Sequence, residues 1–252
     1  MERILEKKVI VITGGARGIG FSLCKGCSKQ GATIIMCDID KQKLEDAVNS
    51  LRKERLDCHS ICLDVTNEEM IQEAFKKINS KYGKIDGLVN NAGIISKVSF
   101  LDSASSDFDK IINVNLRSVY LCCKEASYYM VKQKKGSIVN ISSIAARNGG
   151  GLMGTSIYAA SKGGIISFTK GIARELAPFN VRVNAIAPAS IDTPMTTIGR
   201  NPEQYAATIK KIPLGRRGKP EELVGPVSLL LSDYSSFIVG ATIDVNGGIY
   251  MY

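Results

Sequence analysis

The chain has 252 residues, 44% of them apolar and 23% charged, which is enough apolar surface to bury a core and excludes a disordered chain. Its 33 Lys and Arg residues against 24 Asp and Glu residues give 33 − 24 = +9 with His neutral, and nucleic acid, an acidic membrane, an acidic substrate or solvated surface would each explain that charge. No apolar run approaches the roughly 18 to 20 residues that span a bilayer, and residues 9–12 are too short a run for a signal peptide. We therefore expect a cytoplasmic protein that does not bind membranes.

Short apolar runs alternate with amphipathic segments along the whole chain. The predicted strands are residues 9–13, 33–37, 59–63, 87–90, 137–142, 181–186 and 243–245. The predicted helices are residues 18–30, 41–54, 67–81, 105–133, 156–178 and 220–232. Strands that are apolar throughout are buried on both faces. The alternation therefore predicts an α/β protein with a Rossmann fold, in which helices cover a doubly wound parallel sheet of about seven strands.

No linker interrupts this pattern, so residues 1–252 are predicted to form a single domain. Residues 192–217 have weaker strand character and are expected to form a loop with a short helix, a substrate loop that covers a site. Basic residues occur as scattered doublets such as Lys134-Lys135, without a recognition motif. We therefore expect no nucleic-acid partner.

The cysteine and histidine residues limit the kinds of metal site and catalytic site that the chain can contain. Cys24 and Cys27 form a C-x-x-C inside a predicted helix, but no second pair of ligands accompanies them. We interpret the seven cysteines as structural and expect no metal site. The single histidine, His59, lies in a predicted strand, which excludes Ser-His-Asp hydrolysis.

A glycine-rich turn, Thr13-Gly14-Gly15-Ala16-Arg17-Gly18-Ile19-Gly20, follows the first predicted strand. Glycines there allow a tight turn and let the backbone approach a pyrophosphate. The N-terminus of the following helix then faces the phosphates with unpaired N–H groups. The position between a strand and a helix predicts a dinucleotide site.

Asp38 ends the second predicted strand, 18 residues after Gly20. A carboxylate at this place accepts hydrogen bonds from the adenosine ribose and repels a 2′-phosphate. NAD is therefore favoured over NADP as the cofactor. Arg17 argues the other way, because an arginine in the loop is placed to contact a 2′-phosphate.

Tyr158 and Lys162 lie four residues apart in a predicted helix and so share one face. A cation beside a phenol favours the phenolate, and we expect it to lower the pKa of Tyr158 from about 10. Tyr158 then becomes an acid–base group that works near neutral pH.

With these residues the chain resembles the short-chain dehydrogenase/reductase family over residues 9–248. The motifs that carry the resemblance are residues 13–20, Asp64-Val65, Asn90-Asn91-Ala92-Gly93, Asn115, Ser143, and Tyr158 with Lys162. The nearest subgroup contains 3-oxoacyl-[acyl-carrier-protein] reductases and NAD-linked sugar-alcohol and steroid dehydrogenases. The resemblance implies an oxidoreductase that interconverts a secondary alcohol and a ketone by hydride transfer.

The resemblance also implies a role for each motif. Tyr158 would be the general acid and base, and Ser143 would bind the substrate oxygen. Lys162 would bind the nicotinamide ribose, and Asn115 would hold a water that links Lys162 to solvent. The implied cofactor-binding residues are Gly14, Arg17, Gly18, Ile19, Gly20, Asp38, Asp64, Val65, Asn91, Ala92, Gly93, Tyr158, Lys162, Ile191 and Thr193.

Two positions depart from the family pattern. Tyr158 follows Ser143 by 15 residues, which is longer than in many members, and Ser142 is a rival for the serine role. Ala189 stands where the family has glycine after Pro188. If that position requires a positive φ, alanine is strained there.

Family resemblance fixes the reaction and leaves the substrate open. We rank an NAD-linked secondary-alcohol dehydrogenase first and a 3-oxoacyl-[acyl-carrier-protein] reductase second. Lys134 favours an acyl carrier protein as partner, whereas Phe179 stands where such reductases often place a docking arginine. A cofactor-sensing regulator without catalysis is the remote alternative, and the presence of both Tyr158 and Lys162 argues against it.

The expected substrate pocket is mostly apolar. Its candidate residues are Ile144, Leu152, Met153, Met195 and Ile198, with Asn148, Thr155, Ser156, Arg147 and Arg200 as polar candidates. The resemblance further implies a homo-oligomer, a dimer or a tetramer, with Leu116, Tyr120 and Ile172 as contacts.

Overall fold

The computed structural model describes residues 3–150, 155–197 and 202–251. Its centre is a parallel sheet of seven strands in the order β3-β2-β1-β4-β5-β6-β7. The strands are β1 Val9–Thr13, β2 Thr33–Asp38, β3 Cys58–Cys62, β4 Gly87–Asn90, β5 Gly136–Ile141, β6 Val181–Pro188 and β7 Thr242–Val245. The doubly wound α/β prediction is confirmed, because the order runs outward in both directions from β1 and β4.

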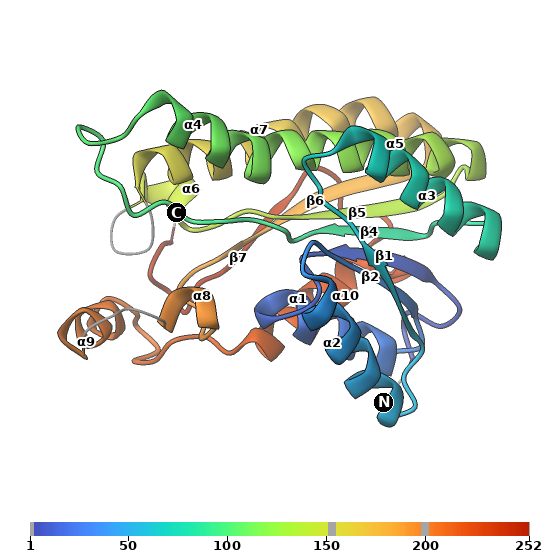
Figure 1. Cartoon of the computed structure of the whole chain (residues 1–252), viewed down its shortest axis with the longest axis horizontal. Coiled ribbons are helices and arrows are strands. Elements are labelled where there is room, and N and C mark those ends of the chain that lie inside the picture. The colour runs from blue at the N-terminus through green and yellow to red at the C-terminus, as the bar shows by residue number, and fades with distance from the viewer. Residues whose placement is uncertain (1–2, 151–154, 198–201, 252) are drawn as a thin grey trace.

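Helices cover both faces of the sheet. In Figure 1, α3, α5 and α7 lie above the sheet, and α1, α2 and α10 lie below it. The helices are α1 Gly18–Lys29, α2 Lys41–Lys53, α3 Glu68–Tyr82, α4 Ser105–Ile112, α5 Ser118–Gln133, α6 Ala145–Asn148, α7 Ser156–Leu176, α8 Pro194–Thr197, α9 Pro202–Lys210 and α10 Val224–Leu231. Each layer packs its apolar side chains on the sheet to form one core cluster per face. Every residue of β1, β4, β5 and β6 is buried, as expected of strands covered on both sides.

Local sequence signals set the helix ends. At the start of α3 the Asn67 side chain accepts a hydrogen bond from the Met70 N–H at 3.0 Å, and Glu68 and Glu69 occupy the first turn. Both features stabilise a helix N-terminus. Gly83 ends α3 with a φ of +73°, a left-handed conformation that glycine adopts without strain.

The helix predicted over residues 105–133 is interrupted. A π-helical turn, Asn113–Arg117, separates α4 from α5. At its centre Asn115 donates to the carbonyl of Ile94 at 2.9 Å and accepts from the Ile94 N–H at 2.8 Å. These bonds tie the turn to the loop after β4, a tertiary interaction that helical periodicity does not contain.

The Cys24–Cys27 pair is buried in α1, and burial raises the pKa of Cys27 to about 12. Among the described residues, no group of three or more His, Cys, Asp or Glu side chains is arranged to hold a metal ion. None of the helices in the described part of the chain is both long and apolar enough to cross a membrane.

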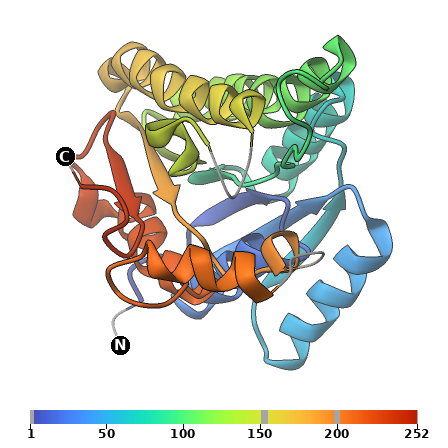
Figure 2. The ribbon, with the colours of Figure 1, turned by 90° about the vertical axis from the view of Figure 1, so that its left-hand side faces the viewer.

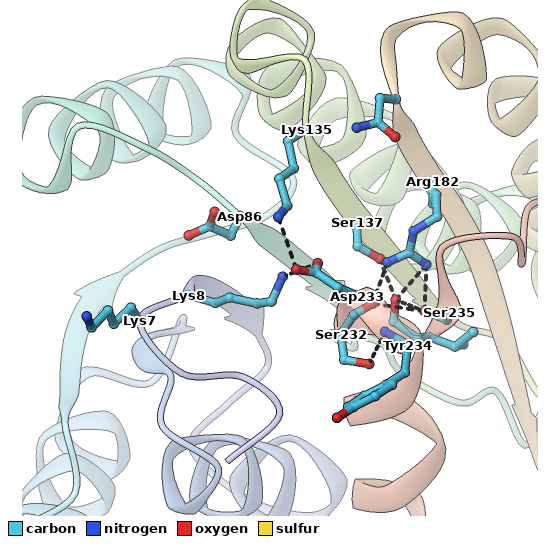
Figure 3. Close-up of polar contacts among 12 residues, drawn as sticks. Lys7, Lys8, Asp86, Lys135, Ser137, Arg182, Ser232, Asp233, Tyr234 and Ser235 are labelled. Carbon is cyan, nitrogen blue, oxygen red and sulfur yellow. Dashed lines mark hydrogen bonds and ion pairs between the residues drawn. The ribbon is translucent and has the colours of Figure 1, made fainter. Parts of the chain in front are cut away.

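Basic residues gather at the amino edge of the sheet with polar partners (Figure 3). Lys8 and Lys135 contact the Asp233 carboxylate at 2.8 and 3.1 Å. The buried Arg182 donates hydrogen bonds of 2.7 and 2.9 Å to the segment 230–235, which includes carbonyls at the end of α10. A helix C-terminus carries partial negative charge and so compensates a buried guanidinium. Part of the +9 charge therefore has a structural explanation.

The segment 192–217 contains two short helices, α8 and α9, where the sequence predicted one. Figure 2 looks onto the carboxyl edge of the sheet and shows both helices in front of it. The returning chain is fixed to the end of β7, because the Leu214 N–H donates to the Gly247 carbonyl at 3.2 Å. This segment, which we call the lid, therefore covers the edge where ligands bind in open α/β sheets.

Candidate active site

A cavity of about 340 Å³ lies at the carboxyl edge, between the strand ends and the lid. Every residue that the sequence assigned to the cofactor or to catalysis lines this cavity except Asn115. Wall residues to which the sequence assigned no role are Ile39, Leu63, Thr66, Ile94, Ile95, Val114, Ile141, Pro194 and Thr196. The wall also contains Ile144 and Met195, which were expected in the substrate pocket, and Ser142, Pro188 and Ala189. Ile39 and Leu63 directly follow β2 and β3, a position from which they could have been identified.

The glycine-rich turn has the backbone shape that a phosphate cradle requires. Gly14 and Gly18 have φ values of +64° and +55°. A Cβ atom on Gly20 would lie 2.0 Å from the Gly14 carbonyl oxygen, so no side chain fits there. The Asn91 amide donates to the carbonyls of Thr13 and Gly14 at 3.0 and 2.9 Å, which fastens the turn to the end of β4. The start of α1 is thereby left facing the cavity.

Asp38 is held rigidly at the end of β2. Its two carboxylate oxygens accept from the Ala16 N–H at 3.1 Å and the Asp40 N–H at 3.2 Å. Arg17 is exposed on the loop, and its charge contributes to lowering the pKa of Asp40. Asp64, at the next strand end, accepts from Thr66 at 2.7 and 2.8 Å. Two carboxylates therefore line the part of the cavity that the sequence assigned to adenosine.

Ser143 and Ser142 have different partners. The Ser143 side chain lies close enough to Tyr158 of α7 to lower the pKa of that phenol, and its hydroxyl accepts a hydrogen bond from the Ala145 N–H at 3.1 Å. The hydroxyl of Ser142 donates to the carbonyl of Lys162 at 2.8 Å. Of the two rival serines, Ser143 is therefore the one in contact with Tyr158.

The pKa of Tyr158 differs from the sequence-based expectation. Burial raises it above its ordinary value of 10.0, and the neighbouring Ser143 side chain only partly opposes this. The expected lowering by Lys162 is wrong for this structure: Lys162 does not contribute to the shift, and burial sets its direction. The Lys162 Nζ lies 5.9 Å from the Tyr158 ring centroid and donates to the Ile141 carbonyl at 2.8 Å. Burial also lowers the pKa of Lys162 itself, to about 8.

Asn115 is fully buried behind the cavity wall. Its Nδ2 donates to Ser161 at 3.1 Å, next to Lys162. A Cβ atom on Gly93 would lie 3.2 Å from the Asn115 Oδ1 and 3.5 Å from the Lys162 Nζ. Gly93 therefore lies close to both side chains, of which Lys162 itself lines the cavity.

The substrate part of the wall is mostly apolar. Of the expected residues, Ile144 and Met195 line it. Leu152, Met153, Ile198 and Arg200 lie outside the described residues. In the described part of the chain Asn148, Thr155, Ser156 and Arg147 are not part of the wall, and the guanidinium of Arg147 lies 3.5 Å from the Asp244 carboxylate.

Ala189 lines the cavity without the strain considered above. Positive φ angles among the described non-glycine residues occur at Lys7, Arg55, Lys134 and Asn180, and Ala189 is not one of them. Its N–H donates to the Val245 carbonyl at 3.1 Å, which continues the β6–β7 pairing by one residue.

Comparisons with known proteins agree with this geometry. A family model described as "Enoyl-(Acyl carrier protein) reductase" matches residues 14–250. The chain is 43% identical over 246 residues to a 3-oxoacyl-[acyl-carrier-protein] reductase of Thermotoga maritima, covering 97% of this chain and 98% of that protein. It is 39% identical over 245 residues to a cyclopentanol dehydrogenase of Comamonas testosteroni, with 97% of each chain covered.

Solved structures show the same architecture. A 3-oxoacyl-[acyl-carrier protein] reductase with bound NAD from Brucella melitensis has a TM-score of 0.91 at 33% identity, over 100% of this chain and 94% of that one. A short-chain type dehydrogenase/reductase from Mycobacterium marinum has a TM-score of 0.94 at 30% identity, over 99% and 98%. The chain belongs to the short-chain dehydrogenase/reductase family, and it is an oxidoreductase that acts on CH–OH groups with NAD or NADP as acceptor.

Proposed function

We propose that the protein is an NAD-linked dehydrogenase that interconverts a secondary alcohol and a ketone, with Tyr158 as the proton donor and acceptor. One observation carries the proposal. Ser143 and Tyr158, which interact with each other, line the same cavity as the glycine-rich turn and Asp38. A hydroxyl that exchanges protons therefore shares one enclosed space with a dinucleotide-shaped cradle.

The wall fits a dinucleotide with a free 2′-hydroxyl. The glycine-rich turn packs tightly against the rest of the chain, because a Cβ atom would lie 2.9 Å from the Ala92 Cα at Gly14 and 2.0 Å from the Gly14 carbonyl oxygen at Gly20, and a tight turn of this kind supports pyrophosphate binding. Asp38 keeps its carboxylate on the cavity wall, where it accepts from a ribose hydroxyl and repels a 2′-phosphate. Asp64 adds a second carboxylate, and Val65 the apolar contact for adenine. A bound nicotinamide dinucleotide supplies the two-electron acceptor or donor.

The chain's own residues then handle the substrate proton. In the alcohol direction Tyr158 accepts the hydroxyl proton, and in the ketone direction it returns that proton to the carbonyl oxygen. Ser143 donates a hydrogen bond to the same oxygen and stabilises negative charge as it develops. With a nicotinamide dinucleotide bound, Lys162 would hold the nicotinamide ribose, Asn115 would hold a water next to Lys162, and Ile191 and Thr193 would hold the carboxamide. The raised pKa of Tyr158 keeps it protonated at neutral pH, which suits its role as the acid in ketone reduction.

The wall favours a compact apolar substrate, because Ile94, Ile144 and Met195 line it. A relative that is 39% identical is a cyclopentanol dehydrogenase, which is in line with that choice.

A second candidate is 3-oxoacyl-[acyl-carrier-protein] reductase, which the 43% identical relative favours. The structure brings the two positions weighed for carrier docking close together, because the Lys134 carbonyl accepts from Asn180, the residue after Phe179, at 3.0 Å. Phe179 is 46% exposed there. These two positions therefore present one cation, Lys134, and one apolar ring, whereas the resemblance implies a cation at both.

We further propose that the protein forms a homo-oligomer through α5 and α7. Tyr120 is 46% exposed on α5 and contacts Phe168 of α7 edge-on, with ring centroids 6.2 Å apart. A half-exposed aromatic pair of this kind is typical of an interface. A monomer in sedimentation equilibrium at micromolar concentration would contradict this.

A substrate panel separates the two candidates. Purified protein is offered cyclic and linear secondary alcohols with NAD and with NADP, and 3-oxoacyl thioesters with the reduced forms of both. The proposal predicts alcohol oxidation with a preference for NAD. Turnover restricted to acyl thioesters, or a preference for the 2′-phosphorylated cofactor, would contradict it.

A further inference from the structure

The first turn of the lid forms one wall of the cavity, and a residue outside the cavity holds it there. Ile191, Thr193 and Thr196 line the cavity, and so do Pro194 and Met195 between them. Behind them lies Arg217, whose side chain is completely buried and is not part of the described cavity wall.

Arg217 contacts four residues within the segment 190–196. Its Nη1 lies 2.7 Å from the Asp192 carboxylate. Its Nε donates to the Ser190 hydroxyl at 2.9 Å, and its Nη2 donates to the Ile191 carbonyl at 2.8 Å and to the Thr196 hydroxyl. The guanidinium thus binds residues before and after the bend at which the chain leaves β6 for the lid.

The backbone joins the same two segments. The Asp192 N–H donates to the Gly218 carbonyl at 2.8 Å, and the Gly218 N–H donates to the Ser190 carbonyl at 3.0 Å. Ile191 and Gly218 form an isolated parallel bridge. The two ends of the lid are therefore closed on each other, with Arg217 at the junction.

Thr196 connects Arg217 to the cavity wall. Its hydroxyl accepts from Arg217 and from the Thr193 N–H, the latter at 3.1 Å. Moving the wall segment outward would break these bonds and leave a buried guanidinium without its acceptors, which is unfavourable. The contacts therefore favour the closed wall before any ligand arrives.

We propose that Arg217 is a positioning residue for the dinucleotide: it holds residues 190–196 in the binding-competent arrangement. The inference rests on the proposed dinucleotide site and adds a residue to which the sequence assigned no role. A wall that is already in place lowers the concentration of dinucleotide needed for binding and leaves the chemical step at saturation unchanged. The signature is therefore a change in KM and Kd for the dinucleotide at nearly constant kcat.

The neighbouring Arg216 is a matched control. It has the same side chain one residue away, half exposed, and it pairs through two bonds of 2.7 and 2.8 Å with Glu222, away from the cavity wall. Arg216→Met therefore removes an ion pair of similar geometry without touching residues 190–196.

The experiment compares Arg217→Met, Arg216→Met and the unaltered protein. We expect Arg217→Met to raise Kd and KM for NAD by about tenfold and to change kcat by less than about twofold. A tenfold rise is expected if residues 190–196 adopt the arrangement that binds NAD only about one tenth of the time. Arg216→Met should leave both within about twofold. Unchanged Kd and KM in folded Arg217→Met would overturn the proposal, and so would a loss confined to kcat.

Two further variants keep the test decisive if Arg217→Met does not fold. Arg217→Lys retains the positive charge but loses the planar guanidinium that donates several hydrogen bonds at once. Asp192→Asn alters the carboxylate partner, whose side chain is 44% exposed. Each should raise the Kd for NAD. Combining Asp192→Asn with Arg217→Lys should cost less than the two effects multiplied, because both act on one contact. Fully multiplicative effects would contradict a shared role.

Proteolysis supplies a readout that does not depend on turnover. Lys210 and Lys211 are exposed in the lid and are cleavable by trypsin. Arg217→Met should speed cleavage after them, and saturating NAD should restore the slower rate. If no alcohol is oxidised but these shifts occur, the proposed reaction fails and the role of Arg217 stands. If alcohols are oxidised but lid cleavage and NAD binding are unchanged, the role of Arg217 fails alone.

Discussion

Ser143 and Tyr158 line one cavity, and Ser143 lowers the pKa of Tyr158, although 15 residues separate them in the chain. Ser143 follows β5, and Tyr158 lies in the first turn of α7. The connection includes Gly149 and Gly150, with φ values of +79° and +106°, so extra length is taken up without moving either end. The reacting groups are thus placed by the sheet and by α7, and the length of the loop between them matters little.

The pH dependence should differ between the two directions. Burial raises the pKa of Tyr158 above 10.0, so the base form is scarce at neutral pH and increases tenfold with each pH unit. Alcohol oxidation should therefore accelerate as pH rises from about 6 to about 9, whereas ketone reduction, which uses the protonated form, should not accelerate. Initial rates at saturating substrates measure both profiles. An oxidation rate independent of pH over this range would contradict the assignment.

Lys162→Met should stabilise the protein while it reduces turnover. Burial lowers the pKa of Lys162 from 10.5 to about 8, so the folded state binds this proton less tightly than the unfolded chain. The penalty is about 3 kcal/mol below pH 8 and disappears as pH rises toward 10.5. Loss of the hydrogen bond from Lys162 to the Ile141 carbonyl reduces the gain in stability by about 1 kcal/mol. Chemical denaturation at neutral pH should thus give a gain of about 2 kcal/mol that shrinks at high pH, and a gain that grows with pH would contradict this.

Asp38→Ala should shift the cofactor preference. It removes the acceptor for the ribose and the charge that opposes a 2′-phosphate, so kcat/KM should fall about tenfold with NAD and rise with NADP. Asp40→Asn is the control, because Asp40 carries a similar charge two residues away and its carboxylate pairs with Lys43 on the surface. If Asp38→Ala and Asp40→Asn shift the preference equally, Asp38 has no specific role.

Gly20→Ala should abolish dinucleotide binding. A Cβ atom there would lie 2.0 Å from the Gly14 carbonyl oxygen, so the cradle has to open. Gly171→Ala is the control, because a Cβ atom at this α7 position has nothing within 4 Å. It should bind NAD normally and gain about 0.5–1 kcal/mol in stability from higher helix propensity. Calorimetric titration with NAD measures the contrast, and tight binding by Gly20→Ala would contradict the cradle assignment.

Local patterns were sufficient to predict the sheet. Apolar runs bounded by turns predicted all seven strands to within two residues at each end, because strands buried on both faces must be apolar throughout. The turn at residues 13–20 was equally readable, since its glycines are required by backbone shape at the place where they occur.

Properties that depend on tertiary environment were not predictable from local patterns. The proximity of Lys162 suggested a lowered pKa for Tyr158, but burial decides the direction, and burial follows from how α7 packs. The π-helical turn at Asn115 depends on its bonds to Ile94. Arg217 looked like one of several basic residues, because the carboxylate it contacts lies 25 residues earlier in the chain.

The most direct test of the central claim is the oxidation of a secondary alcohol by Tyr158→Phe with NAD bound to the same extent as in the unaltered protein. The substitution removes one oxygen atom from a partly buried side chain and leaves the ring in place. The account predicts that formation of the reduced cofactor slows by about 10²–10⁴-fold, the contribution of a positioned general base. Formation of the reduced cofactor at the unaltered rate would contradict the assignment of Tyr158.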